Sequence, residues 1–149
     1  MNPFVGIAHM CVNTKDMKKT VDFYTKAMGF KVVHEELMGP DRKDHEMFPA
    51  LFSLLKLGDL YIEVIEPRGY NKDNIVHAGV VGAIDHMGIE VSDIEAAVKQ
   101  LRDYGVDQPM KISWSTDVFK DKPYRSAALT GPNGEKLGLY EFSNKVFFE

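Results

Sequence analysis

The sequence predicts an α+β domain built from two consecutive βαβββ modules. Three observations lead to this prediction: the beginning of the chain is repeated halfway along it, a helical apolar stripe follows the first strand of each copy, and three extended segments follow each stripe. With 149 residues, 44% of them apolar, the chain is long enough for one domain with a proper core. We therefore expect a single domain over residues 1–149.

The repeat is an alignment without gaps. The segment IAHMCVNTKDMKKTV, which begins at Ile7, matches IDHMGIEVSDIEAAV, which begins at Ile84, and this pairs His9 with His86. The offset is 86 − 9 = 77 residues, about half the chain, whereas the units of a solenoid run about 20 to 50 residues. The offset thus indicates two copies of one supersecondary unit, module 1 at about 4–67 and module 2 at about 81–143.

Each copy opens with a strand and continues with a helix. Ile7, His9 and Cys11 share one face of the first strand, because side chains alternate along a strand. Apolar residues at helical spacing then follow: Met17, Val21, Tyr24 and Met28 in the first copy, and Ile94, Ala97, Val98 and Leu101 in the second. Asp93, or Ser92 before it, is the expected N-cap of the second helix, and Gly105 is its expected C-terminal stop. We expect both helices to cover the outer face of the sheet.

Three further strands are predicted in each module. They cover residues 30–36, 51–57 and 60–66 in the first module, and 106–113, 125–130 and 136–142 in the second. Pro132-Asn133-Gly134 marks a tight turn before the last strand, because Asn-Gly tolerates positive φ values. Residues 37–50 are predicted to form a loop, either a lid or inert surface, and residues 67–80 to connect the modules.

The composition excludes several classes of partner. The chain has 18 basic and 22 acidic residues and a net charge of −4, which gives no basic footprint for nucleic acid. No apolar run approaches the roughly 20 residues that span a bilayer, so we expect no membrane insertion. The one cysteine, Cys11, cannot form an internal disulfide. Because no cationic and apolar leader opens the sequence, we expect a cytoplasmic protein.

Three residues are candidate metal ligands. His9 and His86 occupy equivalent positions of the two copies and would face each other across a pseudo-twofold axis, which is the geometry that a metal needs from two imidazoles. The alternative is that both histidines are core positions inherited from the duplication. Glu63 lies between Ile62 and Val64 in a strand otherwise fit for burial, and a buried carboxylate needs a cation or a hydrogen-bonding partner.

On these residues the sequence resembles the vicinal oxygen chelate superfamily, which includes glyoxalase I, methylmalonyl-CoA epimerase, extradiol dioxygenases, and fosfomycin and bleomycin resistance proteins. The resemblance covers nearly the whole chain. It implies a curved, mixed and mostly antiparallel sheet around a metal-binding cleft, with ligands from the first and fourth strands of each module. His9, Glu63 and His86 stand at three of these positions. The resemblance also implies a homodimer.

The fourth ligand position departs from the family pattern. The last-strand signature of the family looks like D-P-D-G-x-x-[IL]-E-[LF], and the stretch here, residues 131–142, is GPNGEKLGLYEF, with Gly138 in place of the glutamate. The two modules agree on this register, because IEVIE matches LGLYE and pairs Glu66 with Glu141. Glu141 is a possible fourth ligand or base, although strand alternation puts it on the face opposite to position 138 unless a bulge intervenes.

The resemblance implies chemistry in which a divalent cation, Zn, Ni, Co, Mn or Fe, binds two neighbouring substrate oxygens as a Lewis acid. We expect a lyase or isomerase that moves a proton on a small molecule with vicinal oxygens, in the manner of lactoylglutathione lyase or an epimerase. Glu63 is the expected catalytic base, with Glu141 and His34 as outside candidates. Arg125 and Lys122 are candidates for binding an anionic substrate group, although a solvated loop explains them as well.

Two other functions stay open. Two histidines and one carboxylate form the donor set of non-haem Fe(II) oxygenases, which favours an extradiol-type dioxygenase. The missing glutamate also permits a non-catalytic protein that binds or sequesters a small molecule, like the bleomycin resistance members. The retention of His9, Glu63 and His86 argues against that last function, because a site free of metal has no need of all three.

Overall fold

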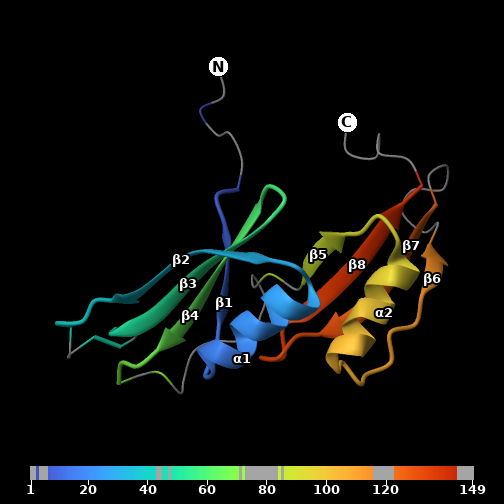
Figure 1. Ribbon diagram of the computed structural model, residues 1–149. Helices are drawn as coiled ribbons and strands as arrows, with labels where there is room; N and C mark the ends of the chain where they lie inside the picture. Colours follow the sequence, from blue (N-terminus) through green and yellow to red (C-terminus); the bar gives the residue numbers. More distant parts are fainter. Residues whose placement is uncertain are drawn as a thin grey trace. The chain divides into compact units, whose positions relative to one another are not determined.

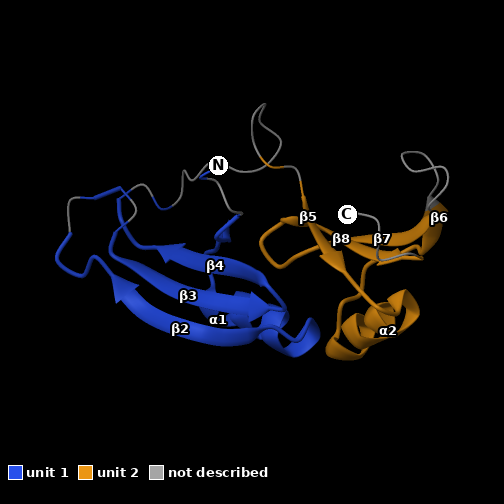
Figure 2. Ribbon diagram, turned by 90° about the horizontal axis from the view of Figure 1, so that it is seen from above, with its two compact units in different colours: residues 1–76 blue, residues 77–149 orange. Residues whose placement is uncertain are grey.

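The computed structural model of the protein (Figure 1) describes residues 3, 7–42, 45–46, 48–70, 72, 84, 86–115 and 123–143. The chain forms two compact units, Met1–Val76 and His77–Glu149, which are blue and orange in Figure 2. Each unit contains one of the two predicted modules.

The first unit has the predicted βαβββ order. Its elements are β1 (Met10–Asn13), α1 (Met17–Asp22), the π-helical turn η1 (Phe23–Ala27), β2 (Lys31–Met38), β3 (Ala50–Leu57) and β4 (Leu60–Pro67). The strand order in the sheet is β1-β4-β3-β2; β1 runs parallel to β4, and the other neighbours are antiparallel. Because α1 contacts β4, one face of the sheet is covered by its helix. We call the opposite face the open face.

The second unit repeats this arrangement. Its elements are β5 (Met87–Glu90), α2 (Ile94–Tyr104), β6 (Ser113–Ser115), β7 (Tyr124–Thr130) and β8 (Lys136–Phe142). The strand order is β5-β8-β7-β6, again with the first strand parallel to the last. The helix α2 contacts β7 and β8 and leaves an open face on the other side of this sheet. The predicted α+β class and the mixed, mostly antiparallel sheet are therefore confirmed.

Both helices begin at an aspartate. The side chain of Asp16 accepts a hydrogen bond from the backbone N–H of Lys19, and Asp93 accepts one from Ala96, each at 2.9 Å. These bonds satisfy N–H groups that have no partner within the helix. The helix α2 ends at Gly105, whose φ of 115° lies in the left-handed region that glycine adopts without strain. The N-cap and the C-terminal stop predicted for this helix are confirmed.

The buried face of the first helix differs from the predicted stripe. The fully buried side chains of α1 and η1 are Thr20, Phe23, Tyr24 and Ala27. Of the predicted stripe only Tyr24 is buried. The inward face passes instead through Thr20, whose hydroxyl lies 2.8 Å from that of Thr14, and continues at ordinary helical spacing. In α2, Ile94, Val98 and Leu101 are buried as predicted. Within the described residues, no helix combines the length and apolar character that a membrane span requires.

The predicted strand at 106–113 is wrong for most of its length, since β6 covers only Ser113–Ser115. Pro109 lacks the backbone N–H that a strand pairing needs. The side chain of Gln108 makes hydrogen bonds to β7 instead. The Gln108 amide accepts from the Thr130 N–H at 2.7 Å and donates to the Thr130 carbonyl at 2.9 Å. A side chain thus makes the two hydrogen bonds that a neighbouring strand would have made with β7.

We expect Gln108→Ala to lower the free energy of unfolding by about 1 to 2 kcal/mol, because two hydrogen bonds of about 0.5 to 1.5 kcal/mol each are lost. Urea unfolding measures this change, and faster hydrogen exchange of the Thr130 amide locates it. Asp107→Ala, a change at the neighbouring exposed residue, is the control. Equal exchange at Thr130 in both variants would contradict the assigned role of Gln108.

Candidate metal centre

The two candidate histidines hold equivalent places in their units. His9 and His86 lie one residue before β1 and β5, the strands at the sheet edges. In β5, Met87 and Ile89 are buried toward the helix, whereas His86 and Gly88 are exposed. Strand alternation therefore places the histidine on the open face of its sheet, as the sequence predicts.

In the first unit, His9 is paired with Glu63. The Nε2 atom of His9 lies 3.3 Å from Oε2 of Glu63. The residue opposite Glu63 in the β1–β4 pairing is Cys11, so the carboxylate belongs to the same open face. Because the Glu63 side chain is 23% exposed and that of His9 45%, both donor groups are within reach of an ion from solvent.

Cys11 lies beside this pair and has a perturbed thiol. Desolvation of the thiol and, second, the negative charge of Glu63 raise the pKa of Cys11 to about 11. The thiol is therefore neutral at pH 7 in the absence of a cation, and the neutral form is a poor nucleophile and a poor ligand. We assign Cys11 no role in the site.

In the second unit, two glycines occupy the positions that Cys11 and Glu63 hold in the first. Gly88 and Gly138 are direct neighbours in the β5–β8 pairing, just as Cys11 and Glu63 are in the β1–β4 pairing. The aromatic ring of Tyr140 lies over both glycines. A Cβ atom built on Gly138 would lie 2.6 Å from Cε2 of this ring, and one built on Gly88 would lie 3.1 Å from it.

The hydroxyl of Tyr140 lies 3.2 Å from Nε2 of His86. The second unit therefore has an imidazole beside an oxygen donor, as the first unit does with His9 and Glu63. Sequence reasoning missed Tyr140 because it considered only carboxylates. The sequence did contain a signal for Tyr140. Gly88 and Gly138, the equivalents of Cys11 and Glu63, leave a space that a large side chain two residues further along the strand can fill.

In each pair, the distance between the two donor atoms suits the binding of one cation by both of them. Imidazole nitrogen and oxygen ligands lie about 2.0 to 2.2 Å from a divalent transition metal, so two adjacent ligands lie about 2.8 to 3.6 Å apart in octahedral or tetrahedral geometry. The distances of 3.3 Å for His9–Glu63 and 3.2 Å for His86–Tyr140 agree with this. Imidazole with oxygen donors is also a set that Zn, Ni, Co, Mn and Fe all accept. The residues present therefore fit a divalent cation.

A hollow of about 420 Å³ adjoins the second pair. His86, Gly138 and Tyr140 line it, together with apolar side chains such as Leu137 and the cation Lys136. Its volume lies within the range of about 300 to 1,000 Å³ that small-molecule sites occupy. A small ligand can thus lie directly beside the His86–Tyr140 pair.

Glu141, the possible fourth ligand or base, lies on the helix side of its sheet. Its Oε2 accepts a hydrogen bond of 2.7 Å from the backbone N–H of Ile94, at the start of α2. Arg125 donates to both carboxylate oxygens, at 2.7 and 2.8 Å from its Nη2. The guanidinium of Arg125 and, second, the Ile94 N–H hold the pKa of Glu141 below its usual range. Glu141 therefore anchors the helix to the sheet.

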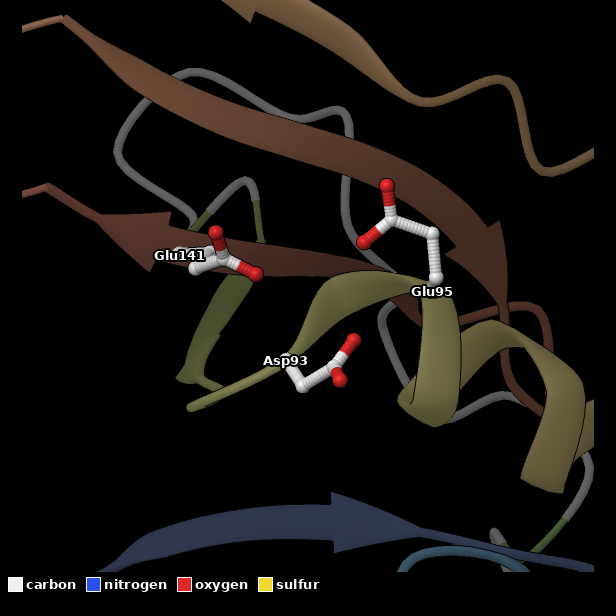
Figure 3. A group of neighbouring side chains, drawn as sticks. All are labelled: Asp93, Glu95 and Glu141. Carbon is white, nitrogen blue, oxygen red and sulfur yellow. The ribbon is translucent and has the colours of Figure 1, made fainter.

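Figure 3 shows Glu141 with Asp93 and Glu95 at the start of α2. One carboxylate oxygen of each lies within 4.8 Å of the others, a spacing that a cation could bridge. Arg125 already binds both Glu95 and Glu141, and Asp93 caps the helix. Because these contacts already occupy the carboxylates, we do not propose a metal site here. The same contacts occupy the guanidinium of Arg125, the candidate for binding an anionic substrate group.

The first unit contains the same anchor. Glu66 Oε2 accepts a hydrogen bond of 2.8 Å from the Met17 N–H at the start of α1, and Arg68 binds its other oxygen at 3.2 Å. Glu66 and Glu141, which the sequence pairs, thus have the same role on the helix-covered faces of the two sheets.

Two further candidates are placed as follows. His34 belongs to the open face of the first sheet, but Leu54 of β3 stands between it and Glu63. Two strand spacings put it about 10 Å away, too far for direct proton transfer. Its Nε2 lies 3.4 Å from Glu36. Lys122 falls outside the described residues.

The model of one protein family matches the sequence. This family is described as the Glyoxalase/Bleomycin resistance protein/Dioxygenase superfamily, and the match covers residues 6–137. No curated protein matches the sequence.

Solved structures share the fold at low identity. A lactoylglutathione lyase from Agrobacterium tumefaciens is 16% identical with a TM-score of 0.61, over 98% of each chain. The fosfomycin resistance protein FosX from Listeria monocytogenes, complexed with Mn(II) and a dihydroxypropylphosphonic acid, is 13% identical with a TM-score of 0.61, over 92% of each chain. An antibiotic binding protein from Streptomyces is 16% identical with a TM-score of 0.61, over 96% of this chain and 100% of that one.

We expect Glu141→Gln to lower the melting temperature at pH 7 and to leave metal uptake intact. A carboxyl group with a lowered pKa stabilises the fold above its unfolded-state pKa, near 4.5, and this contribution is lost as the pH falls through the lowered value. The difference in melting temperature between the wild type and Glu141→Gln should therefore be largest above about pH 4.5 and shrink at lower pH.

Thermal unfolding at a series of pH values, with metal analysis of each preparation, tests this expectation. The exposed Glu90, exchanged for Gln, is the matched control. Loss of the cation from Glu141→Gln would mean that this carboxylate serves the metal rather than the helix.

Proposed function

The chain belongs to the Glyoxalase/Bleomycin resistance protein/Dioxygenase superfamily, and from this premise we propose that it is a divalent-metal-dependent lyase or isomerase. Its substrate in this proposal is a small molecule with two neighbouring oxygens, such as an α-hydroxy carbonyl or a thiohemiacetal. The observation that carries the proposal is the pairing, at equivalent places of the two modules, of an imidazole with an oxygen donor.

In this proposal His9 and Glu63 hold the cation from the first unit, and His86 holds it from the second. The bound cation supplies Lewis-acid stabilisation of the negative charge that develops on the substrate oxygens. The support for a cation is the donor spacing of 3.3 Å between His9 and Glu63, together with the duplication that gives His86 the matching position.

Glu63 is the proposed base. Its Oε2 faces His9, and we assign its other oxygen, Oε1, to the proton of the substrate. Oε1 takes the proton from the hydroxyl-bearing carbon and returns it to the former carbonyl carbon, while the hydroxyl proton passes to the former carbonyl oxygen, so that the reaction is an isomerisation with no net change in atoms. Two other candidates are less favoured for this step. His34 lies two strands away from Glu63, and Glu141 is held in an ion pair with Arg125.

The hollow beside His86 and Tyr140 is the proposed place for the body of the substrate. Its size suits a small molecule, and Lys136 in its lining favours one with an anionic group. A homodimer is expected from the superfamily resemblance and belongs to the proposal.

A second candidate function is an extradiol-type dioxygenase. It is favoured by the donor set of two histidines and one carboxylate, which matches that of non-haem Fe(II) oxygenases. A third is a protein that binds a small molecule without catalysis, which the glycine at position 138 favours.

We expect His86→Ala to lower the affinity for Zn(II) at least about 100-fold, because it removes one of the two imidazoles rather than a group that only orients a ligand. Titration with the metal alone, followed by calorimetry, measures this. His34→Ala, at a histidine outside the proposed donor set, should leave the affinity unchanged. Equal losses in the two variants would contradict the assignment.

The bound metal and the reaction separate the three functions. Protein purified without chelator should contain Zn, Ni, Co or Mn and isomerise a hemithioacetal, with activity lost in Glu63→Gln. Iron, together with oxygen uptake on a catechol, would favour the dioxygenase. Absence of metal, together with tight binding of an unmodified ligand, would favour the binding protein.

A further inference from the structure

We propose that the hydroxyl oxygen of Tyr140 is the metal ligand that the second module contributes in place of the family glutamate. The proposal rests on the proposed function, because it concerns the same cation. It adds a fourth ligand to His9, Glu63 and His86, and it gives a role to a residue that neither the family pattern nor the sequence comparison singles out.

The two donor pairs are equivalent. Nε2 of His9 lies 3.3 Å from a Glu63 oxygen, and Nε2 of His86 lies 3.2 Å from the Tyr140 oxygen. The glutamate comes from position 63 and the tyrosine from two residues beyond the matching position 138, yet each oxygen meets the same nitrogen of its histidine. The oxygen of Tyr140 is therefore placed beside His86 in the same way as the Glu63 carboxylate is placed beside His9.

The glycine at 138 and the tyrosine at 140 depend on each other. A Cβ atom at Gly138 would lie 2.6 Å from Cε2 of Tyr140 and 2.8 Å from its hydroxyl oxygen. Carbon atoms do not approach this closely, so any side chain at 138 would force the ring away from His86. The absence of the glutamate is thus what lets the tyrosine hydroxyl reach the histidine.

Neighbouring rings hold Tyr140 in place. Its ring stacks on that of Phe142, with 6.2 Å between centroids and 8° between planes, and lies 5.9 Å from that of Tyr124. These contacts limit the rotation of the side chain, so the hydroxyl is positioned beside His86 before a metal arrives.

The chemistry needs no further reactant. A phenol oxygen is a donor that the same cations accept alongside imidazole and carboxylate. When it binds the cation, the O–H bond breaks, the new metal–oxygen bond forms and the proton passes to solvent, with no change in oxidation state. Compared with a glutamate, the tyrosine supplies one oxygen instead of two, so it acts as a ligand and leaves proton transfer from the substrate to Glu63.

The test uses Tyr140→Phe, which keeps the ring and removes the oxygen. We expect its Zn(II) affinity to be at least about tenfold lower than that of the wild type, as for the loss of a group that contacts or orients a bound metal. The spectroscopic readout is loading with Fe(III): a phenolate oxygen on this ion gives a charge-transfer absorption in the visible range. The wild type should show this band and Tyr140→Phe should not.

Tyr124→Phe is the matched control, because it removes a tyrosine hydroxyl from a ring that contacts Tyr140. It should keep the band and the Zn(II) affinity. If the wild type binds Zn(II) through His86 but Tyr140→Phe shows unchanged affinity and spectrum, the ligand role of Tyr140 fails and the proposed function stands. If the wild type binds no metal, the proposed function itself fails.

A rescue experiment tests the exchange of one oxygen donor for the other. The double variant Gly138→Glu with Tyr140→Ala removes the ring and restores the family glutamate at the position equivalent to Glu63. We expect it to bind Zn(II) at least about tenfold more tightly than Tyr140→Ala alone, without the visible Fe(III) band. No gain from the added glutamate would overturn the idea that the tyrosine oxygen replaces it.

Discussion

The proposed site depends on one interaction that occurs twice, a histidine nitrogen beside an oxygen donor on the open face of a sheet. His9 meets Glu63 in the first module, and His86 meets Tyr140 in the second. Each pair consists of one residue just before the first strand and one residue in the last strand of its module. The parallel pairing of those two strands brings the pair together, because it places neighbouring residues of both strands on the same face.

The two faces of the duplicated sheet have diverged to different extents. On the helix-covered face, Glu66 and Glu141 make the same contacts, each with the first N–H of its helix and with an arginine. A helix start needs such an acceptor in both modules. On the open face, Gly88 and Gly138 occupy the positions that Cys11 and Glu63 hold in the first module. In the proposed site an oxygen from a different position, that of Tyr140, takes the place of the carboxylate.

Much of the fold could be predicted from the sequence because its signals are local. Strand alternation, the aspartate caps and Gly105 depend on neighbouring residues, and the repeat supplies each of these signals twice. The short β6 could not be predicted, because a side chain, that of Gln108, replaces the strand hydrogen bonds. The inward face of the first helix includes the polar Thr20, whose hydroxyl contacts that of Thr14, and apolar periodicity does not reveal a buried polar residue.

The duplication marks His9 and His86 in the sequence as candidates for the site. The sequence also singles out Glu63 in the fourth strand, and in the structure one of its oxygens lies 3.3 Å from His9. The position of Glu141 on the helix side also follows from the spacing of 138 and 141 in an unbroken strand. Tyr140 was not predictable from residue types, because its contact with His86 depends on how its ring folds back over two glycines in adjacent strands.

In the proposed site, His9 and His86, one from each module, bind a single cation. X-ray absorption spectroscopy of the zinc-loaded protein at one equivalent of metal counts the imidazoles around that ion. We expect two imidazole nitrogens together with oxygen donors, at about 2.0 to 2.2 Å from the metal. A spectrum with one imidazole, or with oxygen donors alone, would contradict this expectation.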